Sequence, residues 1–199
     1  IVGSPEAVVE GAFRGIQKAA QLIDMRGHSG EHPRFGATDV CPFIPVSEAD
    51  MEDCIACARA LGERVGQELN IPVYLYERAA SAPHRRNLAK VRAGEYEGIA
   101  DKITKDEWKP DFGPAAFQPK TGNIAIGARD FLVAFNVNLN TTSVRRANSV
   151  AFDVREAGRV KREGDPITGP VVKDAEGKPV REAGACKAVK GIGWYIEEY

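Results

Sequence analysis

Residues 40–76, VCPFIPVSEADMEDCIACARALGERVGQELNIPVYLY, carry the order of elements that decides the fold. Residues 40–46 read as a buried strand that Pro42 and Pro45 restrict to a short or edge position. Residues 47–69 repeat apolar side chains at helical spacing, which predicts an amphipathic helix, and a second short strand follows over 72–76. A strand, a helix and a strand in this order indicate a sheet with a helix packed on it.

The flanking sequence continues the same alternation. Ser4 and Pro5 form a helix start, with a hydroxyl N-cap and a proline at the first helical position, and the apolar spacing extends this helix to about Met25. The downstream pattern predicts strands over 123–127, 131–139 and 190–198, a helix over 141–157, and a mobile excursion or hairpin over 158–189. Helices that alternate with strands indicate an α/β or α+β chain in which helices pack on one sheet.

Composition excludes several classes of protein. The chain has 199 residues, with 27 Lys and Arg against 28 Asp and Glu, and the net charge of −1 argues against a general polyanion binder. The longest apolar run, 131–135, is far shorter than the roughly 18 residues of a membrane span. The four cysteines are too few for a disulfide scaffold, which favours a reducing cytoplasm. The sequence begins without Met or a secretion signal and closes in a strand-like segment, so we expect both ends to be cut inside something larger.

The densest group of reactive side chains is the segment 26–34, RGHSGEHPR, between a predicted helix and a predicted strand. A histidine here could act as a general acid or base, while a neighbouring carboxylate holds its tautomer and an arginine binds an anionic group. The same pattern also suits a surface loop whose histidines and arginines bond only to backbone. A metal site from His28, Glu31 and His32 is less favoured, because no further ligand is spaced to complete a zinc set.

Four other features carry weaker signals. Cys54 and Cys57 have CxxC spacing, but both fall on the apolar face of a predicted helix, which favours core packing over zinc or redox chemistry. Residues 122–127 begin like a phosphate loop but lack the Lys and Ser/Thr that complete it. The basic stretch 85–92 is typical of a solvated helix face. Residues 108–121 hold three prolines and show no periodicity, which predicts an ordered, functional loop.

Longer motifs run from one end of the chain to the other. They are GEHPR at 30–34, DVCPFIPV at 39–46, VYLY at 73–76, RAGEYE at 92–97, PDFGP at 110–114, GAR at 127–129, FNVNL at 135–139 and GIGWY at 191–195. Together these motifs resemble the glutamate formiminotransferase family. Motifs of this length are specific, unlike an isolated glycine pattern.

The resemblance implies an α+β sandwich of two ferredoxin-like subdomains. Each subdomain would be a sheet with helices on its outer face, and the ligand cleft would lie between the two sheets. Residues 1–129 would form the N-terminal subdomain without its first strand. Residues 130–199 would begin a truncated C-terminal subdomain that contains the excursion at 158–189.

The resemblance also implies transfer of the formimino group from N-formimino-L-glutamate to N5 of tetrahydrofolate, in histidine degradation and without a metal. His32 matches the general base of the family, and Arg34 or Lys120 is expected to meet the glutamate carboxylates. Expected partners are tetrahydrofolate with or without a polyglutamate tail, a second copy of the chain and a cyclodeaminase, with no nucleic acid and no membrane. The folate loop maps to Gly113, Pro114, Ala115, Ala116, Phe117, Gln118, Pro119, Lys120, Thr121 and Gly122.

The residues suit this chemistry. When a secondary amine attacks an amidine carbon, one nitrogen must lose a proton while the departing glutamate amine gains one, and a neutral imidazole can do both. Phe117 offers an aromatic face for a pterin. Three alternatives stay open: formyl transfer from N-formylglutamate, a non-catalytic folate-binding or assembly module, and a metal-dependent hydrolase that uses His28 and His32.

Overall fold

The structure is a computed structural model that describes residues 1–30 and 32–197. These residues fall into two compact units that divide between Val133 and Ala134, and each unit is described by itself. Two predictions touch the remaining residues and lie outside the described ones. They are the role of Glu31 as a carboxylate neighbour or metal ligand, and the last residue of the strand 190–198.

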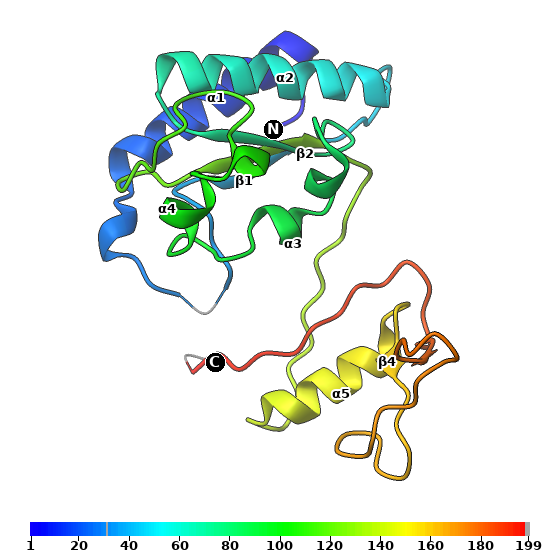
Figure 1. The fold of residues 1–199 in the computed structure, drawn as a ribbon. Helices are drawn as coiled ribbons and strands as arrows, with labels where there is room; N and C mark the ends of the chain where they lie inside the picture. The colour runs from blue at the N-terminus through cyan, green and yellow to red at the C-terminus, as the bar shows by residue number, and fades with distance from the viewer. Residues whose placement is uncertain (31, 198–199) are drawn as a thin grey trace. The chain divides into compact units, whose positions relative to one another are not determined.

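The first unit is built on a three-stranded parallel sheet (Figure 1). β1 (Asp39–Phe43) and β2 (Val73–Glu77) lie on either side of β3 (Ile124–Ala128). Every residue of β3 is buried, as is typical of a parallel strand that is covered on both faces. β1 lies at one edge of this sheet, where the missing N–H of Pro42 is tolerated, and this confirms the predicted edge position.

Two long helices, α1 (Pro5–Leu22) and α2 (Met51–Glu68), cover one face of the sheet (Figure 1). Their apolar side chains pack with inward-facing residues of the strands, such as Leu75, in the larger hydrophobic core. Cys54 and Cys57 belong to this core, and burial raises the pKa of both thiols. The prediction that the CxxC pair packs in the core is therefore confirmed.

Side-chain caps set where these two helices begin. The Ser4 hydroxyl accepts a hydrogen bond from the N–H of Ala7, as predicted for the first helix. The second helix begins at Met51, later than the predicted start at residue 47. It does so because the carboxylates of Asp50 and Asp53 form a capping box that fixes its first turn.

The opposite face of the sheet is covered by the segment between β2 and β3 (Figure 1). The short helices α3 (Leu88–Val91) and α4 (Ile99–Lys102) lie there, and a second core cluster packs around Tyr74, Tyr76 and Phe35. The family resemblance implied helices on the outer face of the sheet, and α3 and α4 cover the second face in addition. Single-turn 3₁₀ helices lie at Met25–Gly27, Pro83–Arg85 and Asp106–Trp108.

The basic stretch 85–92 is only in part a solvated surface. Arg85 is buried, and its guanidinium binds the Asp111 carboxylate at 2.8 Å and the backbone carbonyls of Glu107 and Lys109. The same carboxylate accepts a hydrogen bond from the N–H of Leu75 at 2.7 Å. The prediction was wrong for Arg85 because a run of charges does not reveal a partner that is distant in the sequence.

The second unit contains α5 (Val144–Val154) and an antiparallel hairpin of β4 (Arg159–Val160) and β5 (Arg181–Glu182). These elements confirm the helix predicted over 141–157 and the hairpin interpretation of 158–189. Neither α5 nor any other helix within 1–30 and 32–197 is long and apolar enough to cross a membrane.

Two predicted strands are absent from the described residues. Residues 131–139 and 190–197 pair with no strand there, and Phe131, Val133 and Phe135 are 71%, 87% and 85% exposed. Their aromatic and β-branched composition is typical of a strand. A strand is nevertheless stabilised by its cross-strand neighbours, and the described part of the chain supplies none at these two segments.

Candidate functional site

Backbone hydrogen bonds join the predicted histidine loop to the predicted folate loop. The N–H of Ala37 donates to the carbonyl of Thr121 at 2.8 Å, and the N–H of Asn123 donates to the carbonyl of Phe35 at 2.9 Å. At Gly36 a Cβ would lie 2.1 Å from the Asn123 carbonyl oxygen, so only glycine allows this close approach. Both loops lead directly into parallel strands, and the two segments therefore meet at the amino-terminal edge of the sheet.

The turn between α3 and α4 forms a third side of this site. The Tyr96 hydroxyl donates to the Pro119 carbonyl at 2.6 Å, and its ring lies 5.4 Å from the Phe117 ring between centroids. Burial raises the pKa of Tyr96, which keeps the hydroxyl protonated as a donor. Phe117, the predicted pterin contact, is thus half-buried against Tyr96.

Asp39 anchors the histidine loop at the start of β1. Its φ of 64° lies in the left-handed region, which aspartate tolerates better than most residues. Its carboxylate accepts a hydrogen bond from the N–H of Phe35 at 2.8 Å and pairs with the guanidinium of Arg92. Because Arg92 leads into the Tyr96 turn, this ion pair attaches the histidine loop to that turn.

Arg34 lies beside two carboxylates of the same turn. Its guanidinium pairs with Glu97 and lies 3.5 Å from a carboxylate oxygen of Glu95. Its Nε donates to Nδ1 of His28 at 3.1 Å, and a terminal nitrogen donates to the His28 carbonyl at 3.1 Å. The backbone N–H of Glu97 and the Arg34 guanidinium lower the pKa of the Glu97 carboxyl. The predicted carboxylate-binding arginine is therefore already engaged with acceptors from this chain.

His32 is exposed on the same loop. Its Nδ1 lies 2.8 Å from the Pro33 carbonyl oxygen. Because a carbonyl can only accept, Nδ1 carries the hydrogen in this contact, and the proton-accepting lone pair of a neutral ring lies on Nε2. This tautomer is the one that a general base acting through Nε2 requires.

The predicted folate loop begins and ends in glycines of left-handed conformation. Gly113 has φ 79° and Gly122 has φ 63°, and the N–H of Gly122 donates to the Gln118 carbonyl at 2.7 Å. The exposed Lys120 side chain reaches back to α1, where its Nζ lies 3.3 Å from the Gln21 carbonyl. The remaining loop residues are Pro114, Ala115, Ala116, Phe117, Pro119 and Thr121, of which both alanines and Pro119 are exposed.

Sequence reasoning assigned no role to five side chains that hold this site together. Four of them lie in the RAGEYE motif at 92–97, which entered the sequence analysis as part of the family resemblance, and its Arg92 also ended the basic stretch that was interpreted as a solvated helix face. A usable signal is present, because Gly94, with φ 89°, marks a turn between an arginine and two acidic residues. The five residues are Asp39, Arg92, Glu95, Tyr96 and Glu97.

The described residues do not test the metal site of His28, Glu31 and His32, because Glu31 lies outside them. No three His, Cys, Asp or Glu side chains within 1–30 and 32–197 are grouped so that they could hold a metal ion. One ring nitrogen of His28 is already the acceptor for Arg34.

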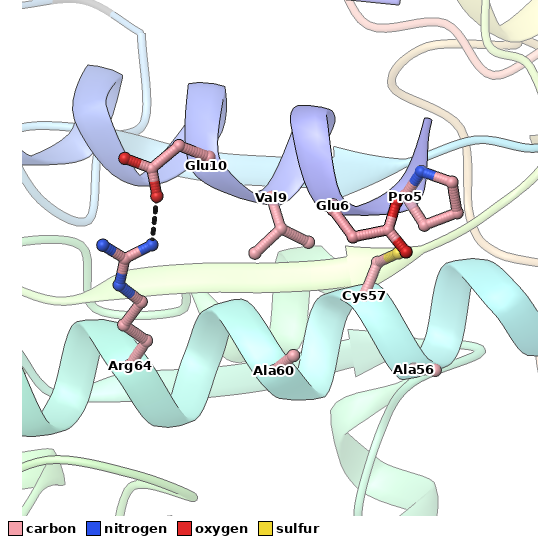
Figure 2. Close-up of a pocket in the computed structure, with 8 residues that line it drawn as sticks. All are labelled: Pro5, Glu6, Val9, Glu10, Ala56, Cys57, Ala60 and Arg64. Carbon is pink, nitrogen blue, oxygen red and sulfur yellow. Dashed lines mark hydrogen bonds and ion pairs between the residues drawn. The ribbon is translucent and has the colours of Figure 1, made fainter. Parts of the chain in front are cut away.

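A separate pocket lies between α1 and α2 (Figure 2). Its walls carry small or apolar residues such as Val9, Ala60 and Cys57, and an ion pair between Glu10 and Arg64 lies at one end. This pairing lowers the pKa of the Glu10 carboxyl. None of the predicted site residues lines the pocket, so we place the candidate site at the joined loops.

The fold and the loops together define an α/β domain whose candidate site is a histidine loop joined to a glycine-bounded loop. Residues 1–129 match the model of the formiminotransferase domain, N-terminal subdomain, and residues 134–199 match the model of the formiminotransferase domain. The chain belongs to the formiminotransferase-domain family.

Named relatives agree with this membership. The chain is 49% identical over 197 residues to a formimidoyltransferase-cyclodeaminase of Rattus norvegicus, which covers 99% of the chain and 33% of the relative. It is 44% identical over 158 residues to a glutamate formimidoyltransferase of Streptococcus pyogenes, and this match covers 79% of the chain and 53% of the relative. It is 52% identical over 149 residues to a glutamate formimidoyltransferase of Thermoplasma acidophilum, and this match covers 74% of the chain and 49% of the relative. The chain thus spans about a third of the length of the first relative and about half of the other two.

Proposed function

We propose that the protein that contains this chain is a glutamate formimidoyltransferase, which moves the formimino group from N-formimino-L-glutamate to N5 of tetrahydrofolate. The observation that carries this proposal is the junction at Gly36, which joins the His32 loop to the loop 113–122. Membership of the formiminotransferase-domain family and the names of the relatives support the same transferase class.

His32 moves the protons in this proposal. N5 of tetrahydrofolate attacks the amidine carbon, and Nε2 of His32 takes the proton that N5 loses as the new C–N bond forms. The C–N bond to the glutamate nitrogen then breaks while that nitrogen receives the proton, so glutamate leaves as an amine. The tautomer indicated by the contact between His32 and the Pro33 carbonyl supports this role.

The loop 113–122 binds the folate, and Phe117 supplies the aromatic face for the pterin. Lys120 is favoured over Arg34 for the glutamate carboxylates, since its side chain is exposed whereas the Arg34 guanidinium lies between Glu95 and Glu97. The proposal also includes a boundary between two subdomains at residues 129 and 130, and a homo-oligomer. It further includes binding of folate with a polyglutamate tail, a reaction without a metal, and a cytoplasmic location. A cyclodeaminase partner is supported by the names of the longer relatives.

An assay of the full-length protein with both donors tests the proposal. Formiminoglutamate should be the donor, and His32→Ala should lower kcat about 100- to 10,000-fold while tetrahydrofolate affinity changes by less than about threefold. Near-normal turnover in the variant would remove His32 from the mechanism. Activity with N-formylglutamate alone would assign formyl transfer instead, and folate binding without any transfer would assign a binding module.

A further inference from the structure

Arg34 sits in a cluster that we call the Arg34 clasp, formed by His28, Arg34, Glu95 and Glu97. Its guanidinium makes two hydrogen bonds of 3.1 Å to His28, one to the ring and one to the backbone carbonyl. It also pairs with Glu97 and lies 3.5 Å from Glu95, and its side chain is 13% exposed. The donors of this arginine are therefore used within the chain.

The charge of the clasp is unsuited to an anionic ligand. One guanidinium faces two carboxylates, and Nδ1 of His28 accepts a hydrogen bond from that guanidinium. The formal charge of Arg34, Glu95 and Glu97 together is thus negative. N-formimino-L-glutamate brings two further carboxylates, so it would be repelled unless it first displaced Glu97 from Arg34.

The clasp instead fixes the position of the histidine loop. His28 and Arg34 lie on either side of His32 in the sequence, and their mutual hydrogen bonds hold the two ends of this segment together. Glu95 and Glu97 attach the segment to the turn whose Tyr96 holds the folate loop at Pro119. One set of contacts therefore sets where His32 lies relative to the loop 113–122.

We infer that Arg34 is a positioning residue, which acts through Glu97 and His28 to orient His32, and that it is not the ligand of the donor carboxylates. This inference rests on the proposed function, because it concerns proton transfer by His32. If Arg34 acts only through the clasp, removing its carboxylate partner should have the same consequence as removing Arg34 itself.

Steady-state kinetics of Arg34→Gln, Glu97→Gln and the double variant in the full-length protein test this equivalence. Each single variant should lower kcat roughly 10- to 100-fold, since a small misplacement of a catalytic group is sufficient for such a loss. The KM for formiminoglutamate should change by less than about threefold, and the double variant should be no worse than either single one. Glu68→Gln, which removes an exposed ion pair with Arg64 on α2, is the matched control and should behave as wild type.

A rise of about tenfold or more in the donor KM of Arg34→Gln, with unchanged kcat in Glu97→Gln, would overturn the inference in favour of direct carboxylate binding. Amide exchange across 28–37 supplies a readout that needs no activity: it should accelerate in Arg34→Gln and Glu97→Gln at unchanged melting temperature, and not in Glu68→Gln. Unchanged exchange in both clasp variants would overturn the inference whatever the kinetics. Absence of transfer by the wild type would reject the proposed function and the catalytic role of the clasp with it, while accelerated exchange would still show that the clasp holds the loop.

Discussion

At the scale of single residues, pairs of a carboxylate and a guanidinium hold the loops of the first unit in place. The side chains of Arg85 and Asp111 are 7% and 10% exposed, whereas those of Arg26 and Asp24 are 65% and 41% exposed. Removal of one partner from a buried pair leaves an uncompensated charge, whereas an exposed pair contributes little because water screens it. The two pairs should therefore respond to substitution in different ways.

Replacement of Arg85 tests the buried pair. Arg85→Met should lower the free energy of unfolding by about 3–5 kcal/mol, because it leaves the Asp111 carboxylate buried without its cation. Arg86→Met is the matched control, because Arg86 is the exposed neighbour of Arg85. Urea denaturation of Arg85→Met and Arg86→Met measures the loss in each. The control should stay within about 0.5 kcal/mol of wild type. Equal losses in the two variants would contradict the assignment of Arg85 as a structural anchor.

The exposed pair makes a prediction about pH. The Arg26 side chain and backbone N–H lower the pKa of Asp24 from its usual 3.8 to about 2. Because the pKa of Asp24 is lower in the folded state, the pair stabilises the protein at pH values above the pKa of Asp24 in the unfolded chain. This contribution is lost as the pH falls through the pKa of Asp24 in the folded state. NMR titration of the Asp24 carboxyl should show the lowered pKa in wild type and in Arg14→Ala. In Arg26→Ala the pKa of Asp24 should rise part of the way towards its usual value. An unchanged pKa in Arg26→Ala would assign the shift to another group.

At the scale of elements, the loop 113–122 is held against its neighbours at both ends. A Cβ at Gly113 would lie 2.3 Å from the Ile71 carbonyl oxygen, and one at Gly122 would lie 2.7 Å from the Phe35 carbonyl oxygen. Both glycines have positive φ. The ends of the loop thus need glycine for conformation and for space, and a loop held in this way loses less entropy when a ligand binds it.

Substitution of either glycine should therefore impair folate binding. Gly113→Val and Gly122→Val should each cost about 1–3 kcal/mol from the backbone conformation alone, with the clash in addition. Tetrahydrofolate should slow amide exchange across 113–122 in the wild-type full-length protein and less in these variants. Gly164→Val is the matched control, since Gly164 has φ 69° but open space around its Cβ position. Unchanged exchange at saturating folate would place the folate site elsewhere.

At the scale of the whole molecule, the described chain divides into two units. The first unit has two core clusters, one on each face of its sheet. Residues 130–140 lie in no helix or strand of the described chain, and every one of them is exposed. This segment lacks both features that protect a backbone from proteases, which are burial and ladder hydrogen bonds.

Limited proteolysis should therefore cut the 199-residue chain first between residues 130 and 140. Chymotrypsin at low ratio should cleave after Phe131 or Phe135, which are 71% and 85% exposed, before it cleaves after Phe13 or Phe35, which are 1% and 0% exposed. Mass spectrometry of the first fragments identifies the sites. Early cleavage at Phe13 or Phe35 would show that the first unit opens more readily than its packing indicates.

The sequence by itself determined those features whose cause lies within a few residues. The Ser4 cap, the edge position of β1, and the core position of Cys54 and Cys57 all follow from local geometry or from apolar spacing. Composition alone marked the aperiodic loop 108–121, because its three prolines fix φ wherever they occur, whereas the bounds 113–122 came from the family resemblance.

Only the tertiary structure decided which of these pieces meet. It paired Arg85 with Asp111 and Arg34 with Glu97, it joined the His32 loop to the loop 113–122 at Gly36, and it placed no strand of the described residues beside 131–139. The physical reason is the same in each case. An ion pair, a close backbone approach and a strand ladder each depend on a partner that is distant in the sequence, and local propensity contains no information about which distant residues the packing brings together.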